Sequence, residues 1–404
     1  MGNGKIFKAF IISATFSCML FLSGCATVTR HAVPSGLFNK AELAGMPGVR
    51  TFYGVTNASF QKDILESFYQ EGKNDYPVSA KGVKTYPFLF ISGGAANGAY
   101  GAGLLKGWSE SGTRPFFKVV TGVSTGALTA PYAFLGKDYD GKDEDLYTKV
   151  STKDIMKFKG PIRILLGDSL ASNKPLEKYI DEIVSPEILK KIAAEHMRGR
   201  RLYVGTTNMD AQRFVVWNMG AIALKGDREL FEKVLLASAA IPVTFPPVFF
   251  HVEADGKKYD EMHADGGTSS QVFSLYNMTG DLRPVAEAAG IDIMKIRADE
   301  YVIRNGYVTA NWQEVKDDIG SIVGRTFDTI IDRQAVGDLY KIYLYAKERG
   351  ESFYLAYIPP DFIPEGKEMF DPKEMRRLFD RGYQDAVKGY AWHATPPGFE
   401  EDKK

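Results

Sequence analysis

The chain has 404 residues, enough for one large α/β domain or two average domains. Its composition, 45% hydrophobic and 25% charged, is typical of a globular protein and excludes an intrinsically disordered chain. Fifty lysines and arginines balance fifty aspartates and glutamates, so the net charge is zero. Because the sequence also lacks a basic stripe interleaved with aromatic residues, nucleic acid is not expected as a partner.

The first residues are typical of a targeting segment. The stretch MGNGKIFK carries two lysines and no acid, and residues 9–22 form an apolar run too short for a comfortable transmembrane helix. The run ends in Leu-Ser-Gly before Cys25, a pattern that resembles a bacterial lipobox. We therefore expect a lipoprotein signal peptide at 1–24 and an acylated Cys25 that anchors the protein at a membrane. A plain secretory signal with a chance cysteine is the alternative.

Two further features accompany this expectation. Cys18 is the only other cysteine and would leave with the signal, so the mature chain would contain no disulfide. Ala26 stands where lipoproteins retained in the inner membrane usually have aspartate. By that resemblance the outer membrane is the expected location, with the periplasmic or surface face left open.

Along the rest of the chain, predicted strands alternate with predicted helices. Residues 25–86 have mixed composition and are expected to form a tether and an N-terminal extension, with a short helix at 60–69. Strands are predicted at 86–92, 116–121, 201–205, 213–217, 249–252, 258–263, 293–305 and 353–358, and helices at 98–107, 127–135, 176–192 (interrupted at Pro186), 229–239, 320–346 and 373–389. The acidic run 138–145 breaks calcium-loop spacing and is expected to be a solvated loop. This order predicts a layered α/β fold with a largely parallel sheet.

The sequence Gly122-Val-Ser124-Thr-Gly126 follows a predicted buried strand and precedes an Ala/Leu-rich helix. A serine at such a strand–turn–helix junction is held with its hydroxyl exposed at the sheet edge. Glycines on either side remove side chains that would clash in so tight a turn. Ser124 is therefore a candidate nucleophile. The alternative is an ordinary serine in a glycine-flanked turn.

A second glycine-rich loop, Ser-Gly-Gly-Ala-Ala-Asn-Gly at 92–98, also connects a strand to a helix. The backbone N–H groups of Gly93, Gly94 and Ala95 are candidate donors to an oxyanion, with Gly98 opening the helix. A nucleotide-phosphate loop is the competing interpretation, but the Lys-Ser/Thr of a P-loop is missing. A simple tight connection is the structural alternative.

The candidate base is aspartate rather than histidine. Asp265, followed by Gly266 and Gly267, comes directly after a predicted hairpin. An aspartate beside two glycines is more often only a turn. His393 alone follows Asp265 in the order expected of an α/β-hydrolase triad, but it lies in a Pro/Gly-rich tail. His263, two residues before Asp265, either orients it or simply packs.

Together these segments resemble the patatin-like phospholipase family over roughly 87–267, with weaker similarity to about 389. The matching segments are LFISGGAANGAYGAGLLKGW, GVSTG, ASAAIPVTFPPV and ADGG, in that order. The resemblance implies a three-layer α/β/α sandwich at 87–395, with core motifs at 91–267. It also implies a Ser–Asp dyad in which Ser124 attacks an ester and Asp265 handles the proton.

The chain departs from the family pattern at two positions. Ala95 stands where the family usually has a third glycine, and Asn97 stands where it usually has a basic residue. An alanine keeps its N–H, provided that the backbone angles suit a residue with a Cβ atom. The missing positive charge puts strict phospholipid preference in doubt more than it does ester hydrolysis.

The expected function is therefore a membrane-anchored lipid acyl hydrolase that works through an acyl-enzyme, with membrane lipid as its substrate. Neither a cofactor nor a metal is expected, because no zinc-type His/Cys cluster is present. A serine esterase, thioesterase or acyltransferase acting on other acyl groups is one alternative. A non-catalytic envelope lipoprotein is another.

Overall fold

The computed structural model describes residues 30–165, 167–279, 282–310, 312–366 and 368–399. The expected signal peptide and Cys25 lie outside these ranges. Within them, a nine-stranded sheet has the order β1-β7-β6-β3-β2-β10-β11, with β9 paired to both β6 and β8. The strands are β1 Arg50–Phe52, β2 Lys84–Ile91, β3 Val119–Val123, β6 Arg201–Asn208, β7 Arg213–Asn218, β8 Val248–Ala254, β9 Lys257–Asp265, β10 Ile296–Arg304 and β11 Ser352–Tyr357; β4 Lys157–Phe158 and β5 Ala171–Ser172 form a separate pair.

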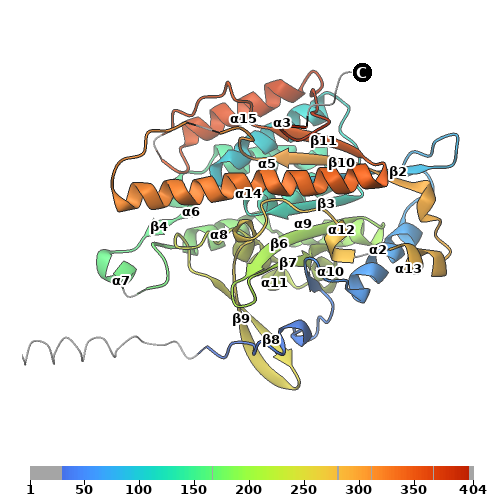
Figure 1. Cartoon of the computed structure of the whole chain (residues 1–404), viewed down its shortest axis with the longest axis horizontal. Coiled ribbons are helices and arrows are strands. Elements are labelled where there is room, and N and C mark those ends of the chain that lie inside the picture. The colour runs from blue at the N-terminus through green and yellow to red at the C-terminus, as the bar shows by residue number, and fades with distance from the viewer. Residues whose placement is uncertain (1–29, 166, 280–281, 311, 367, 400–404) are drawn as a thin grey trace, which may run out of the picture.

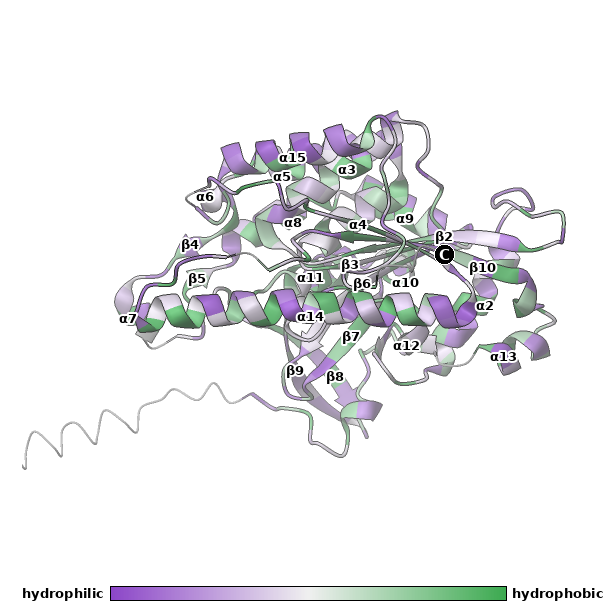
Figure 2. Ribbon diagram, turned by 45° about the horizontal axis from the view of Figure 1, so that its top comes forward, coloured by the Kyte–Doolittle hydropathy of each residue, from purple (hydrophilic) through white to green (hydrophobic). Residues whose placement is uncertain are grey.

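Helices cover both faces of the sheet. In Figure 2, α3, α4, α5, α9 and α15 lie on one side, and α2, α12 and α14 lie on the other. The α-helices are α2 Ala58–Gln70, α3 Gly98–Glu110, α4 Thr125–Leu135, α5 Asp140–Thr148, α6 Thr152–Ile155, α7 Pro161–Leu165, α8 Lys174–Ile183, α9 Pro186–Met197, α10 Met219–Lys225, α11 Arg228–Ser238, α12 Tyr276–Thr279, α13 Arg283–Ala288, α14 Ile319–Arg349 and α15 Pro372–Ala386. Strands β6, β3, β2, β10 and β11 run parallel. The predicted three-layer α/β/α fold class is confirmed.

Each face of the sheet has its own core because side chains alternate along a strand. On β2, Leu89 and Ile91 pack in the core that includes α3 and α4. Phe90 between them points to the other face, where it packs with Leu339 and Ile342 of α14. The long helix α14 therefore lies across the sheet on the face opposite α3, as Figure 1 shows.

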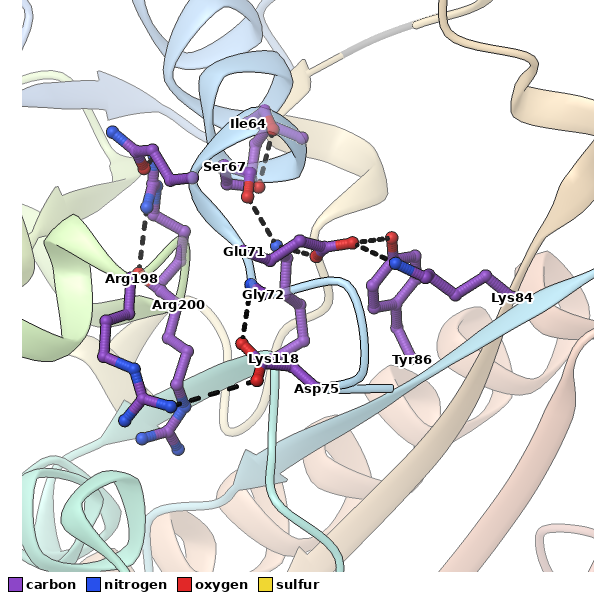
Figure 3. Close-up of polar contacts among 12 residues, drawn as sticks. Ile64, Ser67, Glu71, Gly72, Asp75, Lys84, Tyr86, Lys118, Arg198 and Arg200 are labelled. Atoms are coloured by element: carbon purple, nitrogen blue, oxygen red, sulfur yellow. Dashed lines mark hydrogen bonds and ion pairs between the residues drawn. The ribbon is translucent and has the colours of Figure 1, made fainter. Parts of the chain in front are cut away.

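Residues 30–86 are folded against the domain and do not form the expected tether. Strand β1 pairs antiparallel with β7 and so extends the main sheet. Buried Arg50 donates a hydrogen bond of 3.0 Å to Glu261. Figure 3 shows Glu71, just after α2, bridging Lys118 at 2.6 Å and Lys84 at 2.7 Å. Burial lowers the pKa of Lys118 to about 8, although Glu71 opposes that shift. This segment is an integral part of the folded domain.

Strand β6 brings two loops of the molecule together. Along one edge it pairs first with β3, as far as Gly205, and then with β9 from Thr206 onward. Gly205 of β6 pairs with Val123, the last residue of β3. The next residue of β6, Thr206, pairs with Asp265, the last residue of β9. The residues that follow β3 and those that end β9 therefore meet at one point on the sheet.

Candidate functional site

Ser124 occupies the turn between β3 and α4 in a strained backbone conformation. Its φ of 54° and ψ of −123° lie outside the regions that residues with a Cβ atom prefer. The turn needs its two glycines. A Cβ at Gly122 would lie 2.3 Å from the Gly126 oxygen, and one at Gly126 would lie 2.4 Å from the Ile91 oxygen. The Ser124 N–H donates to Ser238 Oγ at 2.9 Å, which fixes the turn against α11.

Asp265 faces Ser124 at the end of β9. The Ser124 hydroxyl donates a hydrogen bond of 2.6 Å to Asp265 Oδ2, and the Gly267 N–H donates to Oδ1 at 2.7 Å. Both side chains are buried, with Ser124 6% and Asp265 5% exposed. Burial raises the pKa of Asp265 to about 7, against the opposing effect of both hydrogen bonds. A Cβ at Gly266 would lie 2.5 Å from the Gly205 oxygen, so glycine is required for this approach.

The glycine-rich loop after β2 lies beside Ser124. A Cβ at Gly93 would lie 3.3 Å from the Ser124 Cβ. The Gly93 N–H donates to the Gln271 oxygen at 2.9 Å, so it is not available to an oxyanion as the sequence suggested. Among the hydrogen bonds of the described residues, none is donated by the N–H of Gly94 or Ala95. These two groups remain as the candidate oxyanion donors. The prediction for Gly93 is wrong, because its N–H is used to hold the loop in place.

Two residues of this loop have unusual backbone requirements. A Cβ at Gly94 would lie 2.0 Å from the Asn305 oxygen, so the loop can approach β10 only with glycine at this position. Ala95 has a φ of 49°, in the left-handed region that costs a residue with a Cβ about 1 kcal/mol. The family's usual glycine would adopt this angle without strain. Gly98 is also required, because its Cβ would lie 2.3 Å from Thr125 Oγ1.

Arg304, at the end of β10, is a site residue that the sequence did not single out. Its buried guanidinium donates to the Gly93 carbonyl oxygen at 3.0 Å and to Asp332 of α14 at 3.0 Å. It therefore places a cation at the glycine-rich loop, where Asn97 does not supply one. The sequence signal that could have identified Arg304 is its position at the end of a predicted strand. The predicted strand 293–305 ends at the same edge of a parallel sheet as the Gly93 and Ser124 loops.

The two histidines considered from the sequence do not contact the Ser124–Asp265 pair. His263 is buried and bonds to Glu261 at 3.1 Å and Thr206 at 2.9 Å, and burial lowers its pKa. His393 forms a backbone bridge with Leu355, and its ring stacks on Tyr357 with centroids 4.7 Å apart. Within the described residues, no group of histidine, cysteine and acidic side chains is arranged to hold a metal ion.

A cavity adjoins the glycine-rich loop on the side of α15. Ala96 and Asn97 form one part of its wall, and Tyr307, Phe362, Met375 and Leu378 contribute an apolar part. Glu368, Asp371 and Glu374 also line it, so the space is partly acidic. Its position places a partly apolar volume next to the candidate oxyanion donors.

A serine on a strained strand-to-helix turn, hydrogen-bonded to a buried carboxylate on an α/β/α fold, is the arrangement of a serine hydrolase. Residues 89–274 match the family model for patatin-like phospholipase, so the chain contains a patatin-like phospholipase domain. The predicted resemblance to this family is confirmed over these residues, and so is the predicted class of enzyme, a hydrolase acting on carboxylic esters. The family supports lipid as the class of substrate.

Two solved structures share partial similarity with this chain. VipD from Legionella pneumophila is 12% identical, with a TM-score of 0.38 over 78% of this chain and 69% of VipD. The type III effector protein ExoU is 13% identical, with a TM-score of 0.23 over 77% of this chain and 57% of ExoU. No curated protein matches the chain in sequence.

Proposed function

We propose that this protein hydrolyses fatty-acyl esters of membrane lipids through a Ser124–Asp265 dyad. The observation that carries the proposal is the 2.6 Å hydrogen bond from Ser124 Oγ to Asp265 Oδ2, at a strained turn within the patatin-like domain. The hydroxyl is already directed at the group that would receive its proton. Asp265 in turn is oriented by the Gly267 N–H.

The proposed reaction has two steps. Ser124 Oγ attacks the ester carbonyl while its proton passes to Asp265, and the tetrahedral intermediate places its negative oxygen near the N–H groups of Gly94 and Ala95. The C–O bond of the ester then breaks, and the leaving alcohol takes the proton from Asp265. In the second step Asp265 accepts a proton from water as the hydroxide attacks the acyl-serine carbonyl. The bond between that carbon and Ser124 Oγ then breaks, Ser124 Oγ takes the proton back from Asp265, and fatty acid and the free dyad result.

An aspartate can act without histidine because its basicity is raised. A carboxylate of ordinary pKa is too weak a base at neutral pH, whereas one of pKa near the working pH combines ionisation with a useful driving force. Burial raises the pKa of Asp265 to about 7. The dyad therefore needs no imidazole.

Arg304 is proposed as a positioning residue for the oxyanion donors. In a trans peptide the carbonyl and the N–H point in opposite directions. A guanidinium held on the Gly93 oxygen therefore fixes the direction of the Gly94 N–H in the same peptide unit. It also polarises that peptide, which strengthens the N–H as a donor.

Replacing Arg304 with glutamine is expected to lower kcat for a short soluble ester about 10- to 100-fold, a part of what one oxyanion donor contributes. KM should change by about twofold or less, because the lost interaction acts on the transition state. Arg304→Lys should recover part of kcat, because lysine restores the positive charge but not the paired N–H donors of the guanidinium. Steady-state kinetics test this, with thermal unfolding as the folding control. An unchanged kcat in a folded Arg304→Gln protein would contradict the role.

The substrate class is tested by product analysis. The purified protein is incubated with phospholipid vesicles and, separately, with short soluble esters, and released fatty acid is measured. Preferential release from vesicles supports a lipid acyl hydrolase, and turnover of soluble esters alone favours the esterase alternative. Fluorophosphonate labelling that requires Ser124 excludes the non-catalytic scaffold.

Asn97 is consistent with a head-group preference that does not depend on phosphate.

We also propose that the mature protein is anchored through acylated Cys25 and lies at the outer membrane. The support is the sequence around Cys25, with Ala26 after it. Within the part of the chain that the structure describes, no helix has the length and apolar character needed to span a bilayer.

In bacteria that express the protein, labelled palmitate is expected to enter the wild type but not the Cys25→Ala variant. The variant should also leave the membrane fraction, because even two acyl chains suffice for stable anchoring. Separation of the inner and outer membranes on a density gradient shows in which of them the protein is located. A wild-type protein that takes up no label would favour a plain secretory signal.

A further inference from the structure

The β4–β5 hairpin, residues 157–165 and 167–172, projects apolar side chains into solvent. Phe158 is 65% exposed and Ile162, on α7, is 74% exposed; Ile164 and Leu170 are also exposed. Figures 1 and 2 show α7 at one end of the molecule, beyond the layers of the sheet. Isolated exposed apolar residues need no explanation, but a cluster on one short projecting element indicates an interaction surface.

The charges on this hairpin have one predominant sign. Lys157 and Arg163 are exposed, and neither forms an ion pair with another of the described residues. The acidic residue of the hairpin, Asp168, is already paired with Lys159 at 3.1 Å. The hairpin therefore presents two uncompensated cations among exposed apolar side chains. Anionic lipid head groups with acyl chains beneath them complement that combination.

The hairpin is continuous with the candidate active site. The Leu170 N–H donates to the Val243 oxygen at 2.7 Å, and Val243 is 56% exposed. Three residues earlier in the same loop, the Ala240 oxygen accepts from the Asp265 N–H at 2.9 Å. The loop that follows α11 thus links the exposed apolar hairpin, at Val243, to the buried backbone that holds Asp265, at Ala240.

The N-terminal half of α14 adds an apolar face at the same end of the molecule (Figures 1 and 2). Ile319, Phe327 and Ile330 are exposed, whereas Leu339 is fully buried against the sheet. Ile330 and Leu339 are nine positions apart, about two and a half turns, so their side chains point in opposite directions. The first half of α14 therefore turns its apolar side chains away from the protein.

We propose that the β4–β5 hairpin, together with Val243 and the exposed face of α14, is a docking surface for an anionic lipid bilayer. The proposal rests on the proposed lipid hydrolase function, since substrate in a bilayer requires the active-site side of the protein to reach it. Insertion of Phe158 and Ile162 would place the Ser124 side of the sheet at the membrane. Lys157 and Arg163 would contact the head groups.

A fluorescent probe attached to cysteine tests insertion directly. The environment-sensitive dye NBD is attached at Ile162→Cys and, as a matched control, at Met294→Cys. Met294 is a similarly exposed apolar residue, at 67% against 74% for Ile162, and it follows α13, which lies at the opposite end of the molecule. With vesicles containing phosphatidylglycerol, the probe at 162 should shift to the blue and be quenched by spin-labelled lipid. The probe at 294 should not respond.

Function is measured on a paired substitution, Ile162→Glu with Arg163→Glu. We expect at least a tenfold loss of fatty-acid release from anionic vesicles, because each basic residue near a charged membrane contributes about fivefold and the apolar contact is lost as well. Hydrolysis of a short soluble ester should be unchanged, since neither residue contacts the Ser124 site. Met294→Glu should change neither rate.

The outcomes separate this proposal from the proposed function. A probe at 162 that stays in water with all vesicles, or a paired variant with full activity on vesicles, overturns the docking surface. A probe shift that needs no vesicles but rises with protein concentration also overturns it, in favour of a second copy of the chain. Failure of the wild type on every ester would overturn the hydrolase, whereas the probe experiment reports docking independently.

Discussion

Ser124→Ala is expected to reduce ester hydrolysis by about 10⁴- to 10⁶-fold while leaving the protein folded. The expected reduction is this large because the covalent nucleophile is lost, and removing the serine of a serine hydrolase lowers kcat by about this factor. The fold should persist, because alanine keeps the backbone and only the hydrogen bond to Asp265 is lost. Fatty-acid release and fluorophosphonate labelling measure the activity, and circular dichroism measures the fold.

His393→Ala is the matched control for the dyad. Its ring stacks on Tyr357 and contacts neither Ser124 nor Asp265, so most activity should remain. His263→Ala is a poorer control because it breaks a buried network with Glu261 and Thr206. A near-total loss of activity in a folded His393→Ala protein would favour a three-residue triad. Retained turnover in Ser124→Ala would remove the serine mechanism altogether.

The strands and helices with strong periodicity could be predicted from the sequence, whereas elements held by distant contacts could not. The interruption at Pro186 is a boundary between α8 and α9, with the proline at the first position of α9, where its missing N–H is harmless. The acidic run 138–145 was expected to be a solvated loop, but most of it belongs to α5. Arg114 pairs with buried Asp140 at 2.7 Å across the fold, a contact that local sequence does not reveal.

The same distinction holds for the candidate site. The motif order indicated that Ser124 and Asp265 belong together, and the structure joins them by a hydrogen bond. The sequence could not show which N–H groups of the glycine-rich loop are already used, because the partner of Gly93 is a carbonyl at Gln271. Nor did it show that Arg304 brings a cation to this loop, since a basic residue at a strand end has many ordinary roles.

Asp265→Asn is expected to reduce activity strongly and to stabilise the protein at neutral and alkaline pH. Loss of the base should reduce hydrolysis by about 10²- to 10⁴-fold. The stability gain follows from the raised pKa of Asp265, about 7 against an ordinary value of 3.8. Below pH 3.8 both folded and unfolded states hold the proton, so the wild type bears no cost. Between pH 3.8 and 7 the unfolded state loses it first, and by pH 8 the full cost of about 4 kcal/mol is present.

Asparagine escapes that cost because it carries no charge. Its amide oxygen can still accept from the Gly267 N–H, while its NH2 group would donate to Ser124 Oγ, which then acts as the acceptor. The difference in free energy of unfolding between variant and wild type should be near zero at pH 4, grow to pH 7 and level off above it. Denaturant unfolding at several pH values measures it. Over the same range, wild-type kcat/KM should rise about tenfold per pH unit up to about 7, because the ionised form is the base. A stability difference that does not depend on pH would show that the pKa of Asp265 is ordinary, and a histidine-free dyad would then lose its physical basis.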